Sequence, residues 1–252
     1  MTDTADAHTA MPSLKGKRAI ITGGTTGIGR AIAVLLASEG VKVFIGGRDE
    51  GHLADALQRV REVGEGDGMT LDLSEPDASK TFVAAGTRAL GGLDIAVVNA
   101  AISAEGLTDM TEADLRYAIA TNFTAYLLTA HAAAAALVDR GDIVLIGSMS
   151  AHVLGPGSTV YAGIKYGIQG FAEALRRELG PKGIRVANVE PGKTGSNMQL
   201  PDISVEEQRE AIAKDEMLRA EDIAVGVHYL LTQPRRAVVQ QLTITPRGVA
   251  AE

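Results

Sequence analysis

The sequence predicts a single α/β domain in which a doubly wound parallel sheet carries helices on both faces. Short apolar runs of β type alternate with longer helical patterns along nearly the whole chain. Such regular alternation is typical of a parallel sheet whose crossover helices cover both sides. No linker rich in Pro, Gly or Ser and no internal repeat divides the chain, so we expect residues 14–252 to form one domain.

Local periodicity gives the order of the elements. Short apolar runs predict strands, longer amphipathic stretches predict helices, and Gly40 closes the first helix. The expected strands are residues 18–22, 41–45, 69–73, 94–99, 142–147, 184–189 and 238–244. The expected helices are residues 28–38, 52–63, 77–90, 113–138, 160–179, 204–215 and 220–231.

Two segments lie outside this alternation. Residues 1–13 are polar and alanine-rich, without Lys or Arg, and predict a disordered tail rather than a secretory signal or transit peptide. Residues 194–218 are polar, acidic and contain methionine. Ligands bind at the carboxyl ends of the strands in open α/β sheets, so we interpret residues 194–218 as a substrate lid. The alternative is an ordinary surface excursion.

Composition argues against several functions. The 252 residues are 46% hydrophobic and 22% charged, with a formal net charge of −7, which is typical of a soluble globular protein. The sequence has no run of Lys and Arg, which argues against a nucleic-acid partner. It also has no apolar stretch that approaches the roughly 20 residues of a membrane span. There is no cysteine, and no His, Asp or Glu cluster has metal-ligand spacing, so we expect no metal site. We expect a cytoplasmic protein.

A glycine-rich loop, TGGTTGIG, begins at Thr22 after the first expected strand and opens the first helix. Glycine allows a tight turn and a close approach of a pyrophosphate to the backbone. The helix then offers free N–H groups and the positive end of its dipole to phosphate. The glycines could instead serve packing alone, but the strand before and the helix after them favour a nucleotide site.

Four residues form a candidate catalytic set. Tyr161 and Lys165 lie four apart in an expected helix and therefore share one face. A free tyrosine has a pKa of about 10, and a nearby ammonium favours its ionised form. Ser148 follows the fifth strand, where its hydroxyl can meet Tyr161 and stabilise charge on a substrate oxygen. Asn122 lies mid-helix, a position that its propensity disfavours.

The TGxxxGxG loop and the YxxxK pair resemble those of short-chain dehydrogenases/reductases, and the likeness extends from about Lys15 to Arg247. The resemblance implies a Rossmann-type fold and hydride exchange between a nicotinamide cofactor and a small carbonyl or alcohol. It implies that Tyr161 is the general acid/base, that Ser148 contacts the substrate carbonyl, and that Asn122 holds a water that relays protons to Lys165. The cofactor contacts it implies are Gly23, Thr25, Thr26, Gly27, Ile28, Gly29, Arg48, Asp72, Leu73, Asn99, Ala100, Tyr161, Lys165, Pro191, Gly192, Thr194 and Ser196.

The sequence departs from the family pattern in places. Val98 and Ala101 depart from the NNAG motif after the fourth strand. The C-terminal segment looks like the branch that includes serine/3-hydroxy-acid dehydrogenases and clavulanic-acid-dehydrogenase-like reductases. Gln240 and Gln241 replace that branch's usual polar-then-acidic pair, so we do not carry its substrates over.

The end of the second expected strand favours NADP(H). Relatives that bind NAD place an acidic residue there to hold the ribose, whereas this chain has Gly47 followed by Arg48. A guanidinium suits a 2′-phosphate. NAD(H) remains the alternative, because Thr26 stands where many NADP-dependent relatives carry a basic residue, and Asp49 and Glu50 could serve a ribose.

We therefore expect an NADP(H)-dependent oxidoreductase that interconverts a carbonyl and an alcohol. The other alternative is a non-catalytic, cofactor-binding regulatory protein. The helices expected at 113–138 and 160–179 carry apolar residues over more than one face, among them Tyr126, Leu127, Leu128, Phe171 and Leu175. A wide apolar surface needs a partner, and the family pairs these helices across a two-fold axis, so we expect a homotetramer, with a homodimer next.

Overall fold

A computed structural model describes residues 11–137, 140–200 and 202–248, and within them it contains a seven-stranded sheet. The sheet order is β3-β2-β1-β4-β5-β6-β7, and every neighbouring pair is parallel. The strands are β1 (Arg18–Thr22), β2 (Lys42–Gly47), β3 (Gly66–Thr70), β4 (Ile95–Val98), β5 (Asp142–Ile146), β6 (Arg185–Pro191) and β7 (Gln241–Ile244). The strand order reverses between β1 and β4, the place where such sheets bind ligands.

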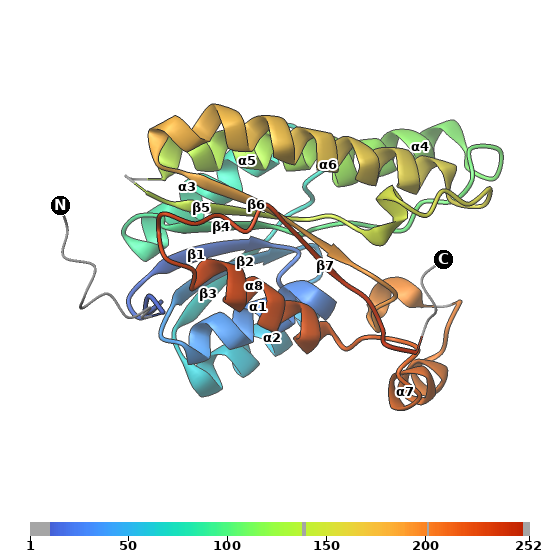
Figure 1. Ribbon diagram of the computed structural model, residues 1–252, viewed down its shortest axis with the longest axis horizontal. Helices are drawn as coiled ribbons and strands as arrows, with labels where there is room; N and C mark the ends of the chain where they lie inside the picture. The colour runs from blue at the N-terminus through green and yellow to red at the C-terminus, as the bar shows by residue number, and fades with distance from the viewer. Residues whose placement is uncertain (1–10, 138–139, 201, 249–252) are drawn as a thin grey trace.

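Helices cover both faces of the sheet (Figure 1). One layer holds α1 (Gly27–Ser38), α2 (Glu50–Val63) and α8 (Ala220–Leu231). The other holds α3 (Ala78–Leu90), α4 (Glu112–Ile119), α5 (Ala125–Ala136) and α6 (Thr159–Leu179). The short helix α7 (Val205–Ala213) lies beyond the carboxyl edge, with the turns η3 (Met149–Ala151) and η5 (Asn197–Gln199), while η4 (Gly180–Lys182) follows α6. The predicted doubly wound, Rossmann-type fold is confirmed.

Two apolar clusters lie on the two faces of the sheet and hold the layers together. Ile21 and Ile45 pack with Leu36 of α1 on one face, and Ile20 and Phe82 pack with Tyr126 of α5 on the other. All six side chains are essentially without exposed surface. Strands buried on both faces are expected of a sheet with helices on both sides. No helix in the described part of the chain is both long and apolar enough to span a membrane.

Three predicted elements are wrong in detail, and one of them is the last strand, which begins at Gln241 rather than at residue 238. The third strand occupies 66–70 rather than 69–73, since Gly66 and Gly68 pair with β2 despite the low strand propensity of glycine. The single helix expected at 113–138 is α4 and α5 joined by a π-helical turn, η2 (Ala120–Thr124). The last residue of that expected helix, like residues 1–10 of the tail expected at 1–13, lies outside the described residues.

Candidate active site

The loop between β1 and α1 has the tight geometry that its glycines predict. Gly23 and Gly27 have left-handed backbone, with φ of +61° and +50°. A Cβ on Gly23 would lie 2.7 Å from the Cα of Ala100, and one on Gly29 would lie 2.1 Å from the Gly23 oxygen. Side chains at these positions would clash with the neighbouring backbone, so only glycine permits this tight packing of the loop.

The N-terminus of α1 is suited to an anion. Thr26 is its N-cap residue but makes no side-chain capping bond, and the first turn, which contains Ile28, has no acidic residue. The free N–H groups and the positive helix dipole are therefore not matched by a local side chain. Asn99 braces the loop, because its Nδ2 donates to the Thr22 and Gly23 carbonyls, each at 3.1 Å. This cradle fits the pyrophosphate of a dinucleotide.

The end of β2 is shaped by Thr25. A Cβ at Gly47 would lie 2.4 Å from Thr25 Oγ1, so the threonine fills the space in which an acidic side chain would begin. Arg48 follows, and its guanidinium donates to the Tyr117 hydroxyl and lies 5.9 Å from the ring centroid. The Tyr117 hydroxyl in turn donates to Asp72 Oδ2 at 2.8 Å. Arg48 is thus tethered beside the end of β3, near the position expected for a ribose.

Lys165 is buried among aromatic rings. It is 2% exposed, and its Nζ donates to the Ile146 carbonyl at 2.9 Å. The Nζ lies 5.2 Å from the ring centroid of Tyr126 and 5.5 Å from that of Tyr161. The Tyr126 hydroxyl donates to the same Ile146 carbonyl at 3.0 Å. Burial lowers the pKa of Lys165 to about 7, so the amine gains and loses a proton near neutrality.

Tyr161 lies in the first turn of α6, and Ser148 begins the η3 turn after β5. Burial raises the pKa of Tyr161 to about 12, although a hydrogen bond with Ser148 works to lower it. The Ser148 hydroxyl also accepts from the Ser150 N–H at 3.0 Å, which fixes its position. The structure therefore brings together Ser148, Tyr161 and Lys165, and the tyrosine is protonated near neutral pH.

Asn122 lies in the π-helical turn η2 and has no exposed surface. Its Oδ1 accepts from the Ile102 N–H, and its Nδ2 donates to the Ile102 carbonyl, both at 2.8 Å. π-Turns inside α-helices frequently mark functional sites. The asparagine side chain ties this turn to the segment after β4 and uses one of its two N–H donors and one of its two acceptor positions to do so.

The ends of β3, β4 and β6 hold the remaining expected cofactor residues. Pro191 ends β6, and the Gly192 N–H donates to the Ile244 carbonyl at 2.8 Å. The Thr194 hydroxyl donates to the Gly192 carbonyl at 2.9 Å, and the Cβ of Ser196 would lie 3.1 Å from a Cβ on Gly27. Leu73 and Ala100 follow β3 and β4 at the same edge of the sheet.

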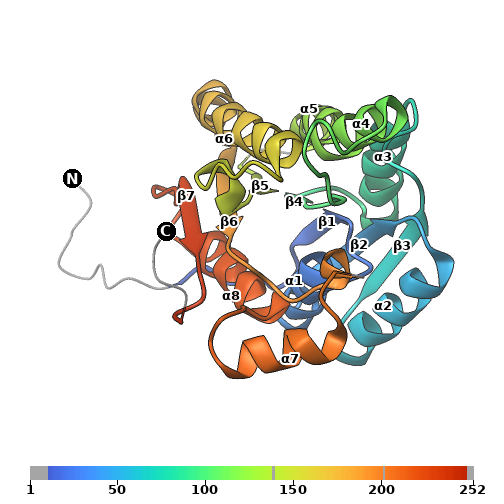
Figure 2. The same ribbon diagram turned by 90° about the vertical axis from the view of Figure 1, so that its right-hand side faces the viewer.

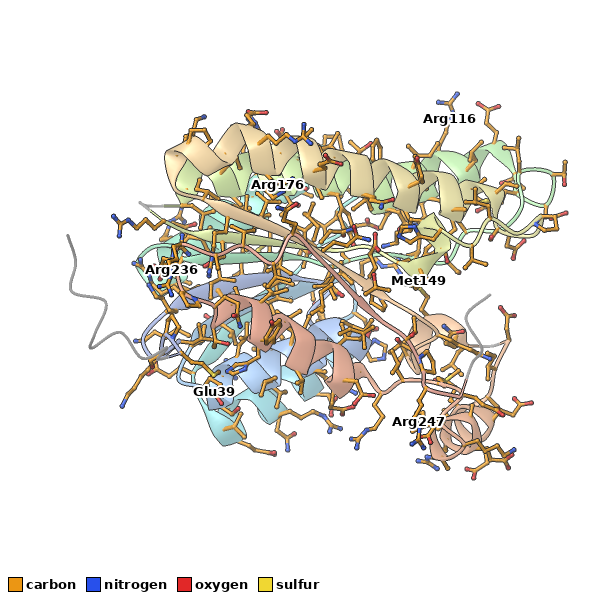
Figure 3. The ribbon with its side chains drawn as sticks, in the orientation of Figure 1. Glu39, Arg116, Met149, Arg176, Arg236 and Arg247 are labelled. Atoms are coloured by element: carbon orange, nitrogen blue, oxygen red, sulfur yellow. The ribbon has the colours of Figure 1, made fainter. Side chains whose placement is uncertain are left out.

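The site has two ends along the sheet edge that faces the viewer in Figure 2. Arg48, Asp72 and Leu73 lie at the β2–β3 end, apart from Ser148, Tyr161 and Lys165 at the β5–α6 end. In Figure 3, Met149 and Arg116 lie in the half of the molecule where the strands end, and Arg176 and Arg236 lie in the opposite half.

Sequence patterns did not single out some residues that contact the site. Tyr117 lies against Arg48, and Tyr126 against Lys165. Gln208 of α7 contacts the segment that follows β6, since its Oε1 accepts from the Ser196 N–H at 2.9 Å. None of the three belongs to a motif, so periodicity alone gives no signal for them. Tyr126 and Leu175, two of the apolar residues named on the two long expected helices, lie in the core.

Comparison with known proteins gives the family. The sequence model described as short chain dehydrogenase matches residues 17–206, and the chain belongs to this family. An uncharacterized oxidoreductase of Staphylococcus aureus is 29% identical over 94% of this chain and all of its own length. A Burkholderia cenocepacia short chain dehydrogenase in complex with NADP is 32% identical, with a TM-score of 0.83 over 93% of this chain and 98% of its own.

A short-chain dehydrogenase/reductase from Serratia marcescens is 30% identical, with a TM-score of 0.84 over 95% of this chain and 100% of its own. The protein is thus a dehydrogenase/reductase enzyme, and the family uses NAD or NADP with small-molecule substrates. This replaces the alternative of a non-catalytic regulatory protein.

Proposed function

We propose that this enzyme uses NADP(H) to interconvert a carbonyl and an alcohol, with Tyr161 as general acid/base. The observation that carries the proposal is the group formed by Ser148, Tyr161 and the buried Lys165 at the carboxyl edge of the sheet. When bound, the nicotinamide would exchange a hydride with the carbonyl carbon. The glycine loop and the uncapped start of α1 would hold its pyrophosphate.

The protonation states favour carbonyl reduction by the resting protein. With a pKa of about 12, Tyr161 carries its proton at neutral pH and can donate it to the substrate oxygen. Ser148 can donate a hydrogen bond to the same oxygen and stabilise its developing charge. Lys165, with a pKa of about 7, can supply a proton to the tyrosine and stabilise the phenolate that donation leaves.

Two contacts support NADP(H) over NAD(H). Thr25 fills the space beside Gly47, so an acidic residue that would hold the ribose hydroxyls has no room there. Arg48 lies beside that position, and a guanidinium forms two charge-assisted bonds to a phosphate. The Burkholderia relative of known structure also binds NADP. NAD(H) is the runner-up, and Asp49 and Glu50 are the residues that would serve it.

The segment 194–218 is proposed as a substrate lid with a fixed base. A parallel bridge joins Thr194 to Leu218, and Met217 is buried. Met198 and Leu200, in contrast, are 36% and 41% exposed and are available for contact with a substrate. Hydrogen exchange of this segment, measured with cofactor alone and with substrate added, tests whether the lid closes. Strong protection in the free enzyme that neither ligand changes would show that the segment is a fixed part of the fold.

A homotetramer, with a dimer next, is proposed from the apolar outer surface. Leu128 and Tyr166 are 48% and 62% exposed on the α5–α6 layer, and Val225 and Tyr229 are 60% and 50% exposed on α8. Large exposed apolar side chains on two separate faces suit a closed symmetric assembly with two kinds of interface. A cytoplasmic location stays a prediction.

The test is NADPH and NADH oxidation by the purified protein against ketones, aldehydes and keto acids, with Tyr161→Phe as the matched variant. The variant keeps the ring and should bind cofactor, yet turnover should fall about 10²–10⁴-fold because the proton donor is lost. Wild-type turnover in Tyr161→Phe, together with unchanged cofactor affinity, would contradict the proposed role of the tyrosine.

A further inference from the structure

A second polar cluster lies beside the catalytic group and is not used by it. Glu190, near the end of β6, has no exposed surface. Its carboxylate accepts from Asn188 Nδ2 at 2.9 Å, from Gln241 Nε2 at 2.5 Å and from the Thr243 hydroxyl at 3.3 Å. The Nε2 of His152 lies 2.8 Å from the same carboxylate. Burying a carboxylate costs free energy unless its oxygens receive hydrogen bonds. The four side chains that converge on Glu190 indicate that its carboxylate acts only as a hydrogen-bond acceptor.

The carboxylate fixes the tautomer of His152. Two acceptors do not hydrogen-bond, so the His152 Nε2 that faces Glu190 carries the proton. In the neutral ring, Nδ1 is then left with a lone pair and can only accept. Among the hydrogen bonds of the described residues, none involves this Nδ1, and the side chain is 38% exposed. The ring therefore keeps one acceptor that the protein leaves open.

His152 closes the short η3 turn that Ser148 begins. Ile146 of β5 pairs with Val189 of β6, and the Gly147 N–H donates to the Val189 carbonyl at 2.7 Å. Beyond this last pair of β5 and β6, Ser148 comes two residues after Ile146, and Glu190 comes one residue after Val189. The η3 turn starts after Ser148, packs against α6, and closes with a 2.8 Å bond from the His152 N–H to the Met149 carbonyl. Figure 2 shows this turn, in yellow, beside the ends of β5 and β6.

We infer that His152 is a specificity-determining residue whose Nδ1 accepts a hydrogen bond from a substrate hydroxyl, and that Glu190 positions it. The inference rests on the proposed function, because it assigns a second contact to the same substrate. The substrate class is a carbonyl compound with a hydroxyl group near the reacting carbon, such as a hydroxy ketone. A keto acid fits less well, because its negative carboxylate would be repelled by the lone pair on the His152 Nδ1 and by the nearby negative charge of Glu190.

The kinetic test compares 1-hydroxybutan-2-one with butan-2-one, which differ by one hydroxyl group, as substrates for the wild type and for His152→Gln. The glutamine amide can still donate to Glu190, so the cluster stays satisfied, but the ring acceptor is gone. We expect the wild type to prefer the hydroxy ketone in kcat/KM by about tenfold or more. In His152→Gln the preference should disappear, while kcat/KM for butan-2-one changes less than about twofold.

A second readout does not depend on turnover. Nitrogen-15 NMR of the cofactor-free wild type should show His152 protonated at Nε2 and unprotonated at Nδ1. A proton on Nδ1, an equal kcat/KM for the two ketones, or a preference that survives in His152→Gln would each overturn the inference. Equal losses on both ketones would assign His152 a structural role and also overturn it. A wild type that reduces no carbonyl compound would instead refute the proposed function, with the NMR result still deciding the tautomer.

Discussion

Replacing Lys165 by methionine should stabilise the fold while it removes activity. The lysine is 2% exposed, and burial lowers its pKa from 10.5 to about 7. At about 1.4 kcal/mol per pH unit, this fall corresponds to roughly 5 kcal/mol of lost stability wherever both folded and unfolded chains carry the charged amine, which is below pH 7. Methionine has a similar length and carries no charge to desolvate.

Part of that gain is offset by interactions that the variant loses. The bond from Nζ to the Ile146 carbonyl contributes about 1 kcal/mol, and the two aromatic rings near the ammonium contribute about 1–2 kcal/mol. The Ile146 carbonyl still accepts from Tyr126, so no buried acceptor is left without a donor. The expected net gain below neutrality is therefore about 2 kcal/mol.

The pH dependence gives the sign of this effect. Between pH 7 and 10.5 the unfolded lysine still binds a proton and the folded one does not, so wild-type stability rises with pH across this window. The advantage of Lys165→Met should accordingly shrink by about 3 kcal/mol between roughly pH 6.5 and pH 9.5, and change sign. Tyr161 does not disturb this range, because its raised pKa affects stability only above pH 10.

The assay is urea unfolding of both proteins at the two pH values, with NADPH oxidation measured in parallel. Lys182→Met is the control, since Lys182 is exposed on the η4 turn and should leave stability nearly unchanged. A stability difference between Lys165→Met and the wild type that does not vary with pH, or a variant less stable than the wild type below neutrality, would refute the desolvation of the amine.

Three further predictions follow from the same contacts. Arg48→Ala should raise KM for NADPH more than for NADH, and equal changes or a native preference for NADH would contradict the proposed 2′-phosphate contact. Tyr126→Phe removes a competing donor to the Ile146 carbonyl and should raise the pKa of Lys165. Tyr126→Leu also removes the aromatic ring and should lower that pKa. If the pH profiles of kcat shifted in the same direction in both variants, this prediction would be contradicted. Light scattering should give a mass that corresponds to four chains of 26.2 kDa or, failing that, to two. The mass of a single chain over a wide concentration range would exclude both the tetramer and the dimer.

Much of the fold was predictable because its signals are local. Apolar runs and breaker residues gave the order of the strands and helices, and the confirmed sheet follows from their alternation. The strand at 66–70 was misplaced because its glycines become a strand only through pairing with β2. The π-turn around Asn122 was missed because hydrogen bonds of its side chain to Ile102 form between distant segments.

The sequence by itself determined which chemical groups the site contains. The spacing of Tyr161 and Lys165 places them on one face of a helix. The glycines of the loop that begins at Thr22 permit the tight turn that a phosphate-binding loop needs. Only the tertiary structure decided the state of those groups. Lys165 titrates near neutrality because three elements enclose it, and Glu190 orients His152 because β5, β6 and β7 end side by side. Desolvation and cross-strand contact depend on what surrounds a residue in space, which no local pattern of residues records.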